Sequence, residues 1–425
     1  MGAYKGMKKI LIVGPALSFS GYGEHARFVL RSLAAIQDSV DLYLKNIPWG
    51  ATSYIIDDSE ERKWIDGLIA KTIQYENGEN KGPYDLSLQV TIPGEWNPGL
   101  ALKNIGVTAG TESSRISPQW FLKSREMDKI IVVSEHAKSA FVNTEYKAAF
   151  EDKQEKTFIS KVECPVDVVG FPCKDITATE PQLDLETDFN FLIVGTLIPR
   201  KNIDNTIRWF INEFRDKEVG LVLKTSLGKN SLVDRKTVLK KIKSVVGSAA
   251  EEIKCKIYLL HGNMSEQEMN GLYRHPKIKG LINLSHGEGF GLPLFEAACA
   301  GLPVITVNWG GQVDFLNMPV KNKKTQKEKM RPMFLPVSYD VRPIQDEAVW
   351  GDILVKGSSW AFAKEWSFRK GINAFMRNYK TYESLAKKLS THIKEEFSDE
   401  KMRSKFLNSI ELSKAEEDEN ESITI

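Results

Sequence analysis

The hydrophobic positions of the chain fall into short apolar runs that alternate with longer amphipathic stretches. In the first third of the chain, β-rich runs stand at 8–14, 40–46, 103–110 and 129–134, and a helix is expected from Tyr22 to about Ile36. Continuous apolar strands that alternate with helices are typical of a parallel sheet covered on both faces. The pattern therefore predicts an α/β domain, which we assign to residues 1–175.

A second α/β series follows a stretch that has no apolar period. Between about Gly170 and Asp188 the chain contains two prolines and many polar residues, so we place an interdomain linker at 176–188. The strands predicted after it are FNFLIVG, VGLVLKT, CKIYLL, IKGLINLS and LPVITVN, and they define a second domain at 189–370. From Trp360 onward the chain is expected to be mostly helical. Helices in 371–425 are expected to pack back toward the first domain, ahead of an acidic tail.

The 425-residue chain has the composition of a globular protein, with 42% hydrophobic and 27% charged residues. Its formal net charge of +2 gives no overall positive field that would indicate a nucleic-acid partner. Four cysteines without Cys-x-x-Cys spacing favour a reducing compartment, and we expect a cytoplasmic protein. The run ILIVGPAL behind Lys8 and Lys9 resembles a weak signal peptide, but a strand that ends in a glycine loop explains all of its residues. Any membrane association is expected to be peripheral.

Positive charge is concentrated in one segment, NMPVKNKKTQKEKMRP at 317–332, which carries six lysines and arginines. A solvated loop is the simplest interpretation of this segment. The alternative is a surface that docks an acidic acceptor or a lipid head group. Because no aromatic residues are interleaved with the cations, the segment is a poor platform for nucleic acid.

The most informative stretch is HGEGFGLPLFEAACAGLPVITVN at 286–308, which predicts a glycine loop, a helix and a strand. Pro293 suits the first turn of the helix, and Gly301 can close it. Free backbone amides and the positive end of the helix dipole would converge behind the glycines, where an anion can approach closely. Glu288 in the loop and Glu296 one turn inside the helix would flank the same opening. The alternative is that Glu296 only complements the helix N-terminus.

A cationic counterpart stands in FLIVGTLIPRKN, where Arg200 and Lys201 follow a buried strand. Open α/β sheets bind ligands beyond the carboxyl ends of their strands. Arg200, Lys201 and the Glu288 loop are therefore expected to face one crevice. Exposed basic pairs are usually only solvated, but the shared sheet edge favours a binding role here.

The segments GTLIPRKN and EGFGLPLFEAACAGLPVI resemble the C-terminal domain of retaining GT-B glycosyltransferases of family 4, the group 1 glycosyl transferases. The shared signature is a glutamate, seven residues and a second glutamate, which Glu288 and Glu296 match. The resemblance is sharp at 193–203 and 285–311 and diffuse elsewhere. It implies a GT-B architecture, in which two Rossmann-like, doubly wound domains face each other across a cleft.

The resemblance also implies a role for each matching residue of the second domain. Lys201, with Arg200 beside it, would hold the donor diphosphate. Glu288 would lie near the donor sugar hydroxyls, and Glu296 would bind the ribose diol of the nucleotide. Thr196 is a departure, because many relatives have an arginine directly after the glycine. Further donor contacts are expected from the amides of Gly289, Phe290, Gly291 and Leu292 and from Asn263 and Met264 beside the base.

The first domain matches the family less explicitly. IVGPALSFSGYGEHARFVLRSL resembles the family opening, so Gly21 and Gly23 would approach the diphosphate from across the cleft. Acceptor-side candidates are His25 and, in TAGTESSRISPQW, Glu112 and Ser113; ordinary loop polarity is the alternative for the last two. His286 is expected to be structural or to lie behind the contacting residues.

The resemblance implies transfer of a sugar from a nucleotide-diphosphate donor to the hydroxyl of a glycan, a lipid-linked sugar or a protein, with retention of anomeric configuration. No Asp-x-Asp follows a strand, so we expect no metal and no further cofactor. An NAD(P)-dependent oxidoreductase is one alternative, because Gly21, Gly23 and Ala26 satisfy Gly-x-Gly-x-x-Ala. A glycan-binding protein with a retired transferase site is the other.

Overall fold

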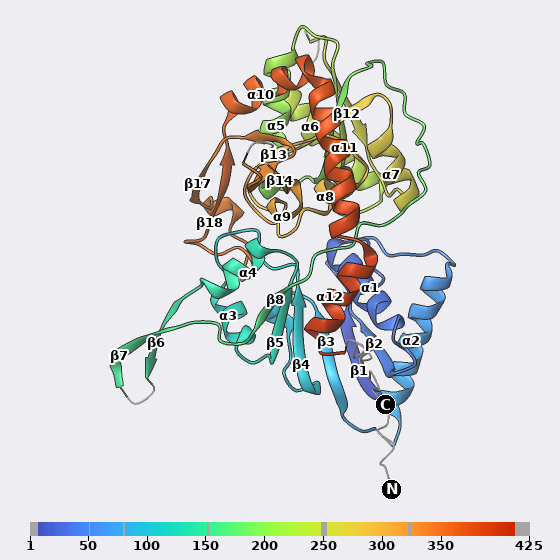
Figure 1. The fold of residues 1–425 in the computed structure, drawn as a ribbon, viewed down its shortest axis with the longest axis vertical. Helices are drawn as coiled ribbons and strands as arrows, with labels where there is room; N and C mark the ends of the chain where they lie inside the picture. Colours follow the sequence, from blue (N-terminus) through green and yellow to red (C-terminus); the bar gives the residue numbers. More distant parts are fainter. Residues whose placement is uncertain are drawn as a thin grey trace, which may run out of the picture.

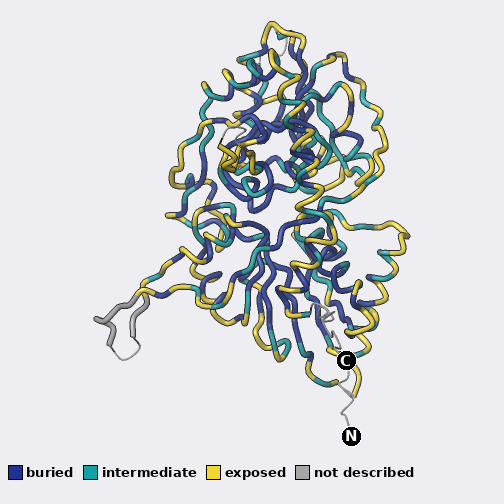
Figure 2. The backbone as a smooth tube through the Cα atoms, viewed as in Figure 1, coloured by how far each residue is buried: buried dark blue, intermediate teal, exposed yellow. Residues whose placement is uncertain are grey.

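The computed structural model describes residues 7–50, 52–79, 81–150, 153–247, 253–321 and 325–412, with the backbone alone given for 148–150 and 153–158. Two lobes lie one above the other, and each is built around a six-stranded parallel sheet (Figure 1). Buried residues are concentrated inside each lobe and in the region where the lobes meet (Figure 2). The fold class is therefore α/β with two Rossmann-like domains, as the alternation of strands and helices predicts.

The N-terminal sheet has the strand order β2-β1-β3-β4-β5-β8. Its strands are β1 (Lys8–Gly14), β2 (Val40–Asn46), β3 (Tyr84–Val90), β4 (Ala101–Thr108), β5 (Lys129–Val132) and β8 (Val166–Val168). The helices of this part of the chain are α1 (Gly21–Ala34), α2 (Glu60–Asn77), η1 (Pro93–Glu95), α3 (Pro118–Ser124) and α4 (Glu135–Val142). The run KKILIVG forms β1, which pairs with β2 on one side and β3 on the other and is thus a central strand.

The C-terminal sheet has the order β11-β10-β9-β12-β13-β16. Its strands are β9 (Asn190–Thr196), β10 (Gly220–Ser226), β11 (Lys256–Leu260), β12 (Ile278–Asn283), β13 (Val304–Val307) and β16 (Leu335–Val337). The helices between and after them are η2 (Pro199–Lys201), α5 (Ile203–Phe214), α6 (Leu232–Val246), α7 (Glu266–Arg274), α8 (Leu292–Cys299), α9 (Val313–Leu316) and η4 (Asp346–Ala348).

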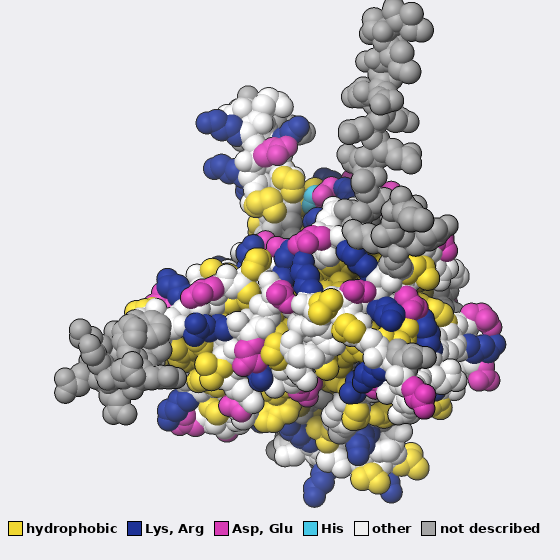
Figure 3. All heavy atoms as spheres, turned by 90° about the horizontal axis from the view of Figure 1, so that it is seen from below, with side chains coloured by type: hydrophobic (Ala, Val, Ile, Leu, Met, Phe, Trp, Pro, Cys, Tyr) yellow, Lys and Arg dark blue, Asp and Glu magenta, His cyan; other side chains and the backbone are white. Residues whose placement is uncertain are grey.

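In the described part of the chain, three two-stranded antiparallel ribbons stand apart from the two large sheets. They are β6 (Tyr146–Phe150) with β7 (Lys153–Ser160), β14 (Asn317–Lys321) with β15 (Glu328–Pro332), and β17 (Tyr339–Pro343) with β18 (Ser359–Ala363). The basic segment 317–332 is thus a β-hairpin and not the expected loop. Seen from below, this hairpin rises clear of the body of the molecule and carries Lys and Arg side chains (Figure 3).

Three helices close the described chain: α10 (Glu365–Arg377), α11 (Tyr379–Glu396) and α12 (Asp399–Ser409). α12 descends to the N-terminal lobe, where it lies beside α1 (Figure 1). Its apolar face, with Met402 and Phe406 fully buried, belongs to the core formed by α1, α2 and the N-terminal sheet. The chain therefore begins and ends its described part in the same lobe.

The expectation of helix from Trp360 onward is wrong at its start. Trp360 lies in β18, pairs with Arg342 of β17, and is fully buried. The helices begin at Glu365. The short alternation SWAFA has strand periodicity, but its position ahead of amphipathic helices concealed it.

Candidate active site

The candidate site lies where the order of the C-terminal sheet reverses. β9 continues through β10 toward one edge of the sheet, whereas β12 continues through β13 toward the other. The loops behind two such neighbouring strands run in opposite directions from their carboxyl ends. A crevice that can hold a ligand forms between these loops. Arg200 and Lys201 lie in η2 behind β9, and Glu288 lies in the loop behind β12. The topology therefore brings the two motifs of the sequence to one point.

The glycine loop behind β12 is shaped for a helix N-terminus open to a ligand. Gly291 is the N-cap of α8 with φ 92°, a conformation that favours glycine, and a Cβ there would lie 2.9 Å from Leu294 Cδ1. Pro293 occupies the first turn, and Gly301 with φ 78° follows the helix end. No side chain caps the first turn of α8. Pro293 has no N–H and the Leu294 amide donates to the Gly291 carbonyl, so the amides left for an anion are those of Leu292 and of the glycine loop ahead of it.

Glu288 is buried among cations. Its Oε1 lies 2.6 Å from Lys201 Nζ and accepts a hydrogen bond of 3.2 Å from Asn283 Nδ2, while Oε2 lies 3.3 Å from Arg200 Nη1. Burial alone would raise the pKa of Glu288, but Lys201 and Arg200 outweigh it and lower the pKa to about 2. Glu288 is therefore ionised at neutral pH and in direct contact with two cations.

Glu296 has a different environment, although both carboxylates belong to one motif. Its side chain is exposed, on the first turns of α8, and its Oε2 accepts a hydrogen bond of 2.8 Å from the Tyr273 hydroxyl of α7. Although the residue as a whole is exposed, the protein packed around its carboxylate excludes water and raises its pKa to about 7, against the opposing effects of Tyr273 and Lys174. An accessible carboxylate that titrates near neutral pH can accept hydrogen bonds from a ligand diol.

The N-terminal domain contacts this site directly. Arg200 Nη2 lies 3.1 Å from Glu112 Oε1, in the loop behind β4. The Ser134 hydroxyl, the N-cap of α4, donates a hydrogen bond of 2.6 Å to the carbonyl of Gly289. Gly21, at the exposed start of α1, faces Leu292, because a Cβ on Gly21 would lie 3.6 Å from Leu292 Cδ1. The starts of α1 and α8 therefore oppose each other across the domain boundary.

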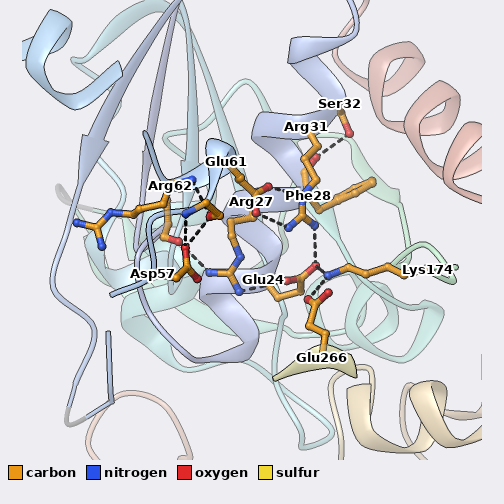
Figure 4. Close-up of polar contacts among 12 residues, drawn as sticks. Glu24, Arg27, Phe28, Arg31, Ser32, Asp57, Glu61, Arg62, Lys174 and Glu266 are labelled. Carbon is orange, nitrogen blue, oxygen red and sulfur yellow. Dashed lines mark hydrogen bonds and ion pairs between the residues drawn. The ribbon is translucent and has the colours of Figure 1, made fainter. Parts of the chain in front are cut away.

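A second ionic bridge joins the two domains beside α8. Lys174 Nζ lies 2.7 Å from Glu24 Oε1 of α1 and 2.5 Å from Glu266 Oε1 of α7, so one lysine bonds both domains (Figure 4). Burial alone would raise the pKa of Glu24, but Lys174, Arg27 and Arg31 lower it to about 2. Lys174 also acts electrostatically on Glu296. The bridge thus couples domain contact to the charge of the exposed site carboxylate.

Several expected contact residues have their side chains inside the protein. His25 is 1% exposed with its ring against Phe171 and a pKa that burial lowers to about 4. Ser113 is fully buried, and its hydroxyl donates to the carbonyl of Arg115 within its own loop. The ring of Phe290 packs in the core. In this arrangement the side chains of His25 and Ser113 are enclosed by protein, and Phe290 presents its backbone and not its ring to the site.

Other expected residues lie around the edge of the site. Thr196 ends β9, and Asn263 and Met264 lie in the loop between β11 and α7, with Asn263 exposed and Met264 half-buried. Gly23 is buried, and a Cβ there would lie 2.0 Å from the Ser18 carbonyl oxygen. Gly23 is thus required for close packing of the loop on α1. His286 stacks on Trp360 and bonds the Ala361 carbonyl through Nδ1 at 2.7 Å, which is a structural role.

The structure adds four residues to the site that the motifs did not indicate: Asn283, Tyr273, Lys174 and Glu24. Asn283 ends the strand ahead of the glycine loop, so its place beside Glu288 follows from the strand boundary. Tyr273 and Lys174 come from separate elements, and no local pattern connects them to the motif. Glu24 lies between Gly23 and His25 in the glycine-loop segment of the first domain, but the motif does not single it out.

The position of the acidic residue argues against a dinucleotide-binding site in the N-terminal domain. In that fold an Asp or Glu at the end of the second strand holds the ribose. Asp41 is the second residue of β2, pairs with Lys9 at the start of β1, and interacts with Lys71 and Tyr43. The carboxyl end of β2 carries Asn46, whose side chain accepts the Leu17 amide. The glycine loop behind β1 therefore lacks the partner that a dinucleotide requires.

The fold and the site define a two-domain protein of the GT-B type. Solved structures with the same architecture include HepE of Anabaena in complex with UDP and glucose, with a TM-score of 0.58, 14% identity and coverage of 95% of this chain and 99% of that chain. Sucrose-phosphate synthase of Thermosynechococcus elongatus aligns with a TM-score of 0.57 and 12% identity over 95% and 98% of the two chains.

Sequence comparison adds the family. Residues 175–323, most of the C-terminal domain, match the family model of glycosyl transferases group 1. A stretch of 117 residues, 27% of this chain, is 35% identical to the serotype-specific mannosyltransferase WbdA of Escherichia coli. That stretch spans 13% of the length of WbdA.

Proposed function

We propose that the protein is a retaining glycosyltransferase that uses a nucleotide-diphosphate sugar and needs no metal ion. The observation that carries the proposal is the group of Glu288, Lys201 and Arg200, held at the sheet switch point beside the open N-terminus of α8. The family match and the mannosyltransferase similarity support sugar transfer. The structural similarity to a protein in complex with UDP and glucose agrees with a nucleotide-sugar donor.

The two cations would bind the donor diphosphate together with the amides of Leu292 and of the glycine loop ahead of α8. In the structure Lys201 and Arg200 both contact Glu288, so an incoming diphosphate competes with this carboxylate for them. As the cations turn toward phosphate, Glu288 gains acceptor capacity for the hydroxyls of the donor sugar. Thr196 supplies no charge where many relatives have arginine, so Arg200 would be the second phosphate cation.

Glu296 would bind the ribose diol, because it is the exposed carboxylate of the pair and two oxygens can accept two hydroxyl hydrogen bonds. The base would then lie near Asn263 and Met264, on the α7 side of the site. Gly21, across from Leu292, would let the diphosphate pass close to the backbone of α1.

The chemistry would be dominated by departure of the nucleoside diphosphate. The bond between the anomeric carbon and the phosphate oxygen breaks, the acceptor oxygen bonds the same face of the sugar, and its proton passes to the departing phosphate. Lys201, Arg200 and the α8 dipole stabilise the negative charge that develops on the leaving group. Glu288 orients the sugar and is not the nucleophile. Contact between the domains excludes water and so suppresses donor hydrolysis.

A thermal-shift and hydrolysis screen tests the proposal. Wild type, Lys201→Ala and a control, Lys256→Ala, are heated with a panel of nucleotide sugars, with NAD and with NADP. Lys256 is a suitable control because it is exposed at the start of β11, at the opposite end of the sheet. We expect one nucleotide sugar to raise the unfolding temperature of wild type and Lys256→Ala, relative to each ligand-free protein, but not that of Lys201→Ala.

Further readouts separate the alternatives. Slow release of nucleoside diphosphate, unchanged by EDTA, would support metal-free transfer, and an NMR spectrum of the product would report its anomeric configuration. Stabilisation by NAD or NADP that Lys201→Ala leaves intact would contradict the proposal. Glycan binding without any nucleotide-sugar turnover would indicate a glycan-binding protein whose transferase site is no longer active.

A further inference from the structure

A hollow that shares no residue with the candidate active site lies between the β14–β15 hairpin and α11. Its volume is about 960 Å³. The hairpin supplies most of the lining, and α11 supplies Leu385 and Lys388. We refer to the hairpin and this lining as the basic hairpin face.

The basic hairpin face is strongly cationic. Its charged members are Lys321, Lys327, Lys329, Arg331 and Lys388 against the single acid Glu328. Lys321 lies 3.6 Å from Glu328. Within the described ranges, the other four cations have no carboxylate within ion-pair distance. A local net charge of 5 − 1 = +4 on a protein of net charge +2 marks a surface that attracts anions.

Apolar side chains are interleaved with these cations. Met330 is 62% exposed and Val320 is 38% exposed, and both belong to the hairpin that projects from the body (Figure 3). The hollow is also lined by the apolar residues Met318, Pro319, Pro332, Met333 and Leu385, of which Pro319 and Pro332 are exposed. The face thus offers charge for an anionic head and apolar surface beside it.

We propose that the basic hairpin face docks on a lipid bilayer that contains anionic phospholipids. Lys and Arg side chains are attracted to the negative surface of such a bilayer, and apolar side chains near them enter the interface. A soluble polyanion would pair with the cations but leave Met330 and Val320 in water. A single-stranded nucleic acid is usually held by aromatic stacking partners, and the described lining contains none. A duplex would contact the cations through its phosphates alone and, like a soluble polyanion, would leave Met330 and Val320 in water. The proposal does not depend on the sugar-transfer activity.

The projecting shape of the hairpin supports a bilayer as the partner. A projecting ribbon with exposed residues on both strands can reach into the headgroup layer while the rest of the domain stays outside it. Within the described part of the chain, no helix is long and apolar enough to span a membrane, so the contact proposed is peripheral.

Co-sedimentation with vesicles tests the proposal. The full chain is mixed with vesicles of phosphatidylcholine alone or with one-third phosphatidylglycerol, and we expect binding only to the anionic vesicles, weakened by added salt. K327E/K329E/R331E should reduce the partition coefficient by at least about tenfold. The control R235E/K236E/K240E makes the same change of charge on the exposed surface of α6 and should bind as wild type does.

The apolar contribution has its own variant. Met330→Ser keeps every charge and should lower vesicle binding severalfold, most visibly at raised salt, where electrostatic attraction is screened. Unchanged unfolding temperatures would show that both hairpin variants are folded. Equal loss in the α6 control would overturn the proposal, as would absence of binding to anionic vesicles. Tight binding to a soluble polyanion such as heparin, with no effect of Met330→Ser, would overturn it in favour of a polyanion site.

Discussion

Arg200 Nη2 lies 3.1 Å from Glu112 Oε1, and this ion pair joins the loop behind β9 of one domain to the loop behind β4 of the other. The same guanidinium donates to the Gly287 carbonyl at 2.6 Å and contacts Glu288. Arg200 therefore contacts the Glu288 carboxylate and the facing domain at once. A change in the separation of the domains must alter the charge balance around Glu288.

The first prediction concerns this ion pair. Glu112→Gln keeps the shape of the side chain but removes the charge that draws Arg200 toward the N-terminal domain. We expect kcat to fall about tenfold, the effect of one misplaced stabilising group, with the donor KM changed much less. Steady-state kinetics with the donor identified by the screen would measure both. Glu126→Gln, an exposed glutamate paired with Lys123, is the control and should leave both constants unchanged.

The second prediction concerns the stability of the buried charge group. Lys201→Ala removes one of the two cations that balance the negative charge of Glu288, a carboxylate that is only 5% exposed. We expect the free energy of unfolding to fall by about 3 kcal/mol. Lys201→Ala with Glu288→Gln removes both charges and should recover part of that loss. Denaturant titration of the four proteins of this double-mutant cycle measures the coupling. If the two losses simply added, the carboxylate would not depend on Lys201.

The third prediction is a pH dependence of donor binding that arises from Glu296. Because its pKa is raised to about 7, the carboxylate becomes protonated as the pH falls through that value and loses acceptor capacity for the ribose. Donor affinity should therefore decline from pH 8 to pH 6. Tyr273→Phe removes a hydrogen bond that lowers the pKa of Glu296, so it should shift the decline to higher pH. Calorimetric titration over this range provides the measurement, and Glu296→Gln should flatten the profile.

The same carboxylate affects stability with a defined sign. Its pKa in the folded state lies above the ordinary value of 4.5, so the folded protein binds more protons than the unfolded chain between these two pH values. The contribution of Glu296 to the free energy of unfolding therefore decreases as pH rises from about 4.5 to about 7. Glu296→Gln should remove this slope. A slope that persists in the variant would have to come from another group.

The fourth prediction concerns the bridge from Glu24 through Lys174 to Glu266. Lys174→Gln removes one of the positive charges that balance the buried Glu24 carboxylate. We expect the free energy of unfolding to fall by about 2 kcal/mol at neutral pH. The pKa of Glu24 is lowered to about 2, so its stabilising contribution is present above its ordinary pKa of about 4.5 and is lost as pH falls toward 2. The difference between wild type and variant should shrink accordingly in acid. Lys63→Gln is the control, because its partner Glu60 is 90% exposed and the pair contributes little.

The local sequence pattern was sufficient to predict the site residues that lie on one strand or in the loop behind it. Arg200, Lys201, Glu288 and the start of α8 each follow a recognisable apolar strand, and sheet topology alone brings them together. Lys174 could not be found in this way, because its partners stand 150 and 92 positions away on α1 and α7. Its role depends on how the domains meet, which no periodicity records.

Polar residues inside a strand concealed another element. YDLSLQV forms the buried strand β3, but Asp85, Ser87 and Gln89 alternate with its apolar residues, which is the pattern of a half-buried strand and not the continuous apolar run of a central parallel strand. Their polar groups are satisfied by tertiary partners: the Ser87 hydroxyl donates to Asn104 Oδ1 at 2.7 Å, and Gln89 Nε2 donates to the Asn97 carbonyl at 2.7 Å. Such partners are absent from the strand sequence itself, so apolar periodicity could not reveal them.

The last prediction concerns the contact of the glycine loop with the facing domain. A Cβ on Gly289 would lie 2.5 Å from the backbone carbonyl oxygen of Ala109, which a side-chain movement cannot relieve. Gly289→Ala should therefore hold the domains apart while leaving each of them folded. We expect transfer to fall by at least about a hundredfold, as for a small displacement of reacting groups, with weaker effects on nucleotide binding to the C-terminal domain. Small-angle scattering should show a larger radius of gyration than wild type. Gly67→Ala, in α2 with open space around the added methyl group, should leave transfer and size unchanged; a Gly289→Ala protein as active and as small as wild type would show that this contact is not required.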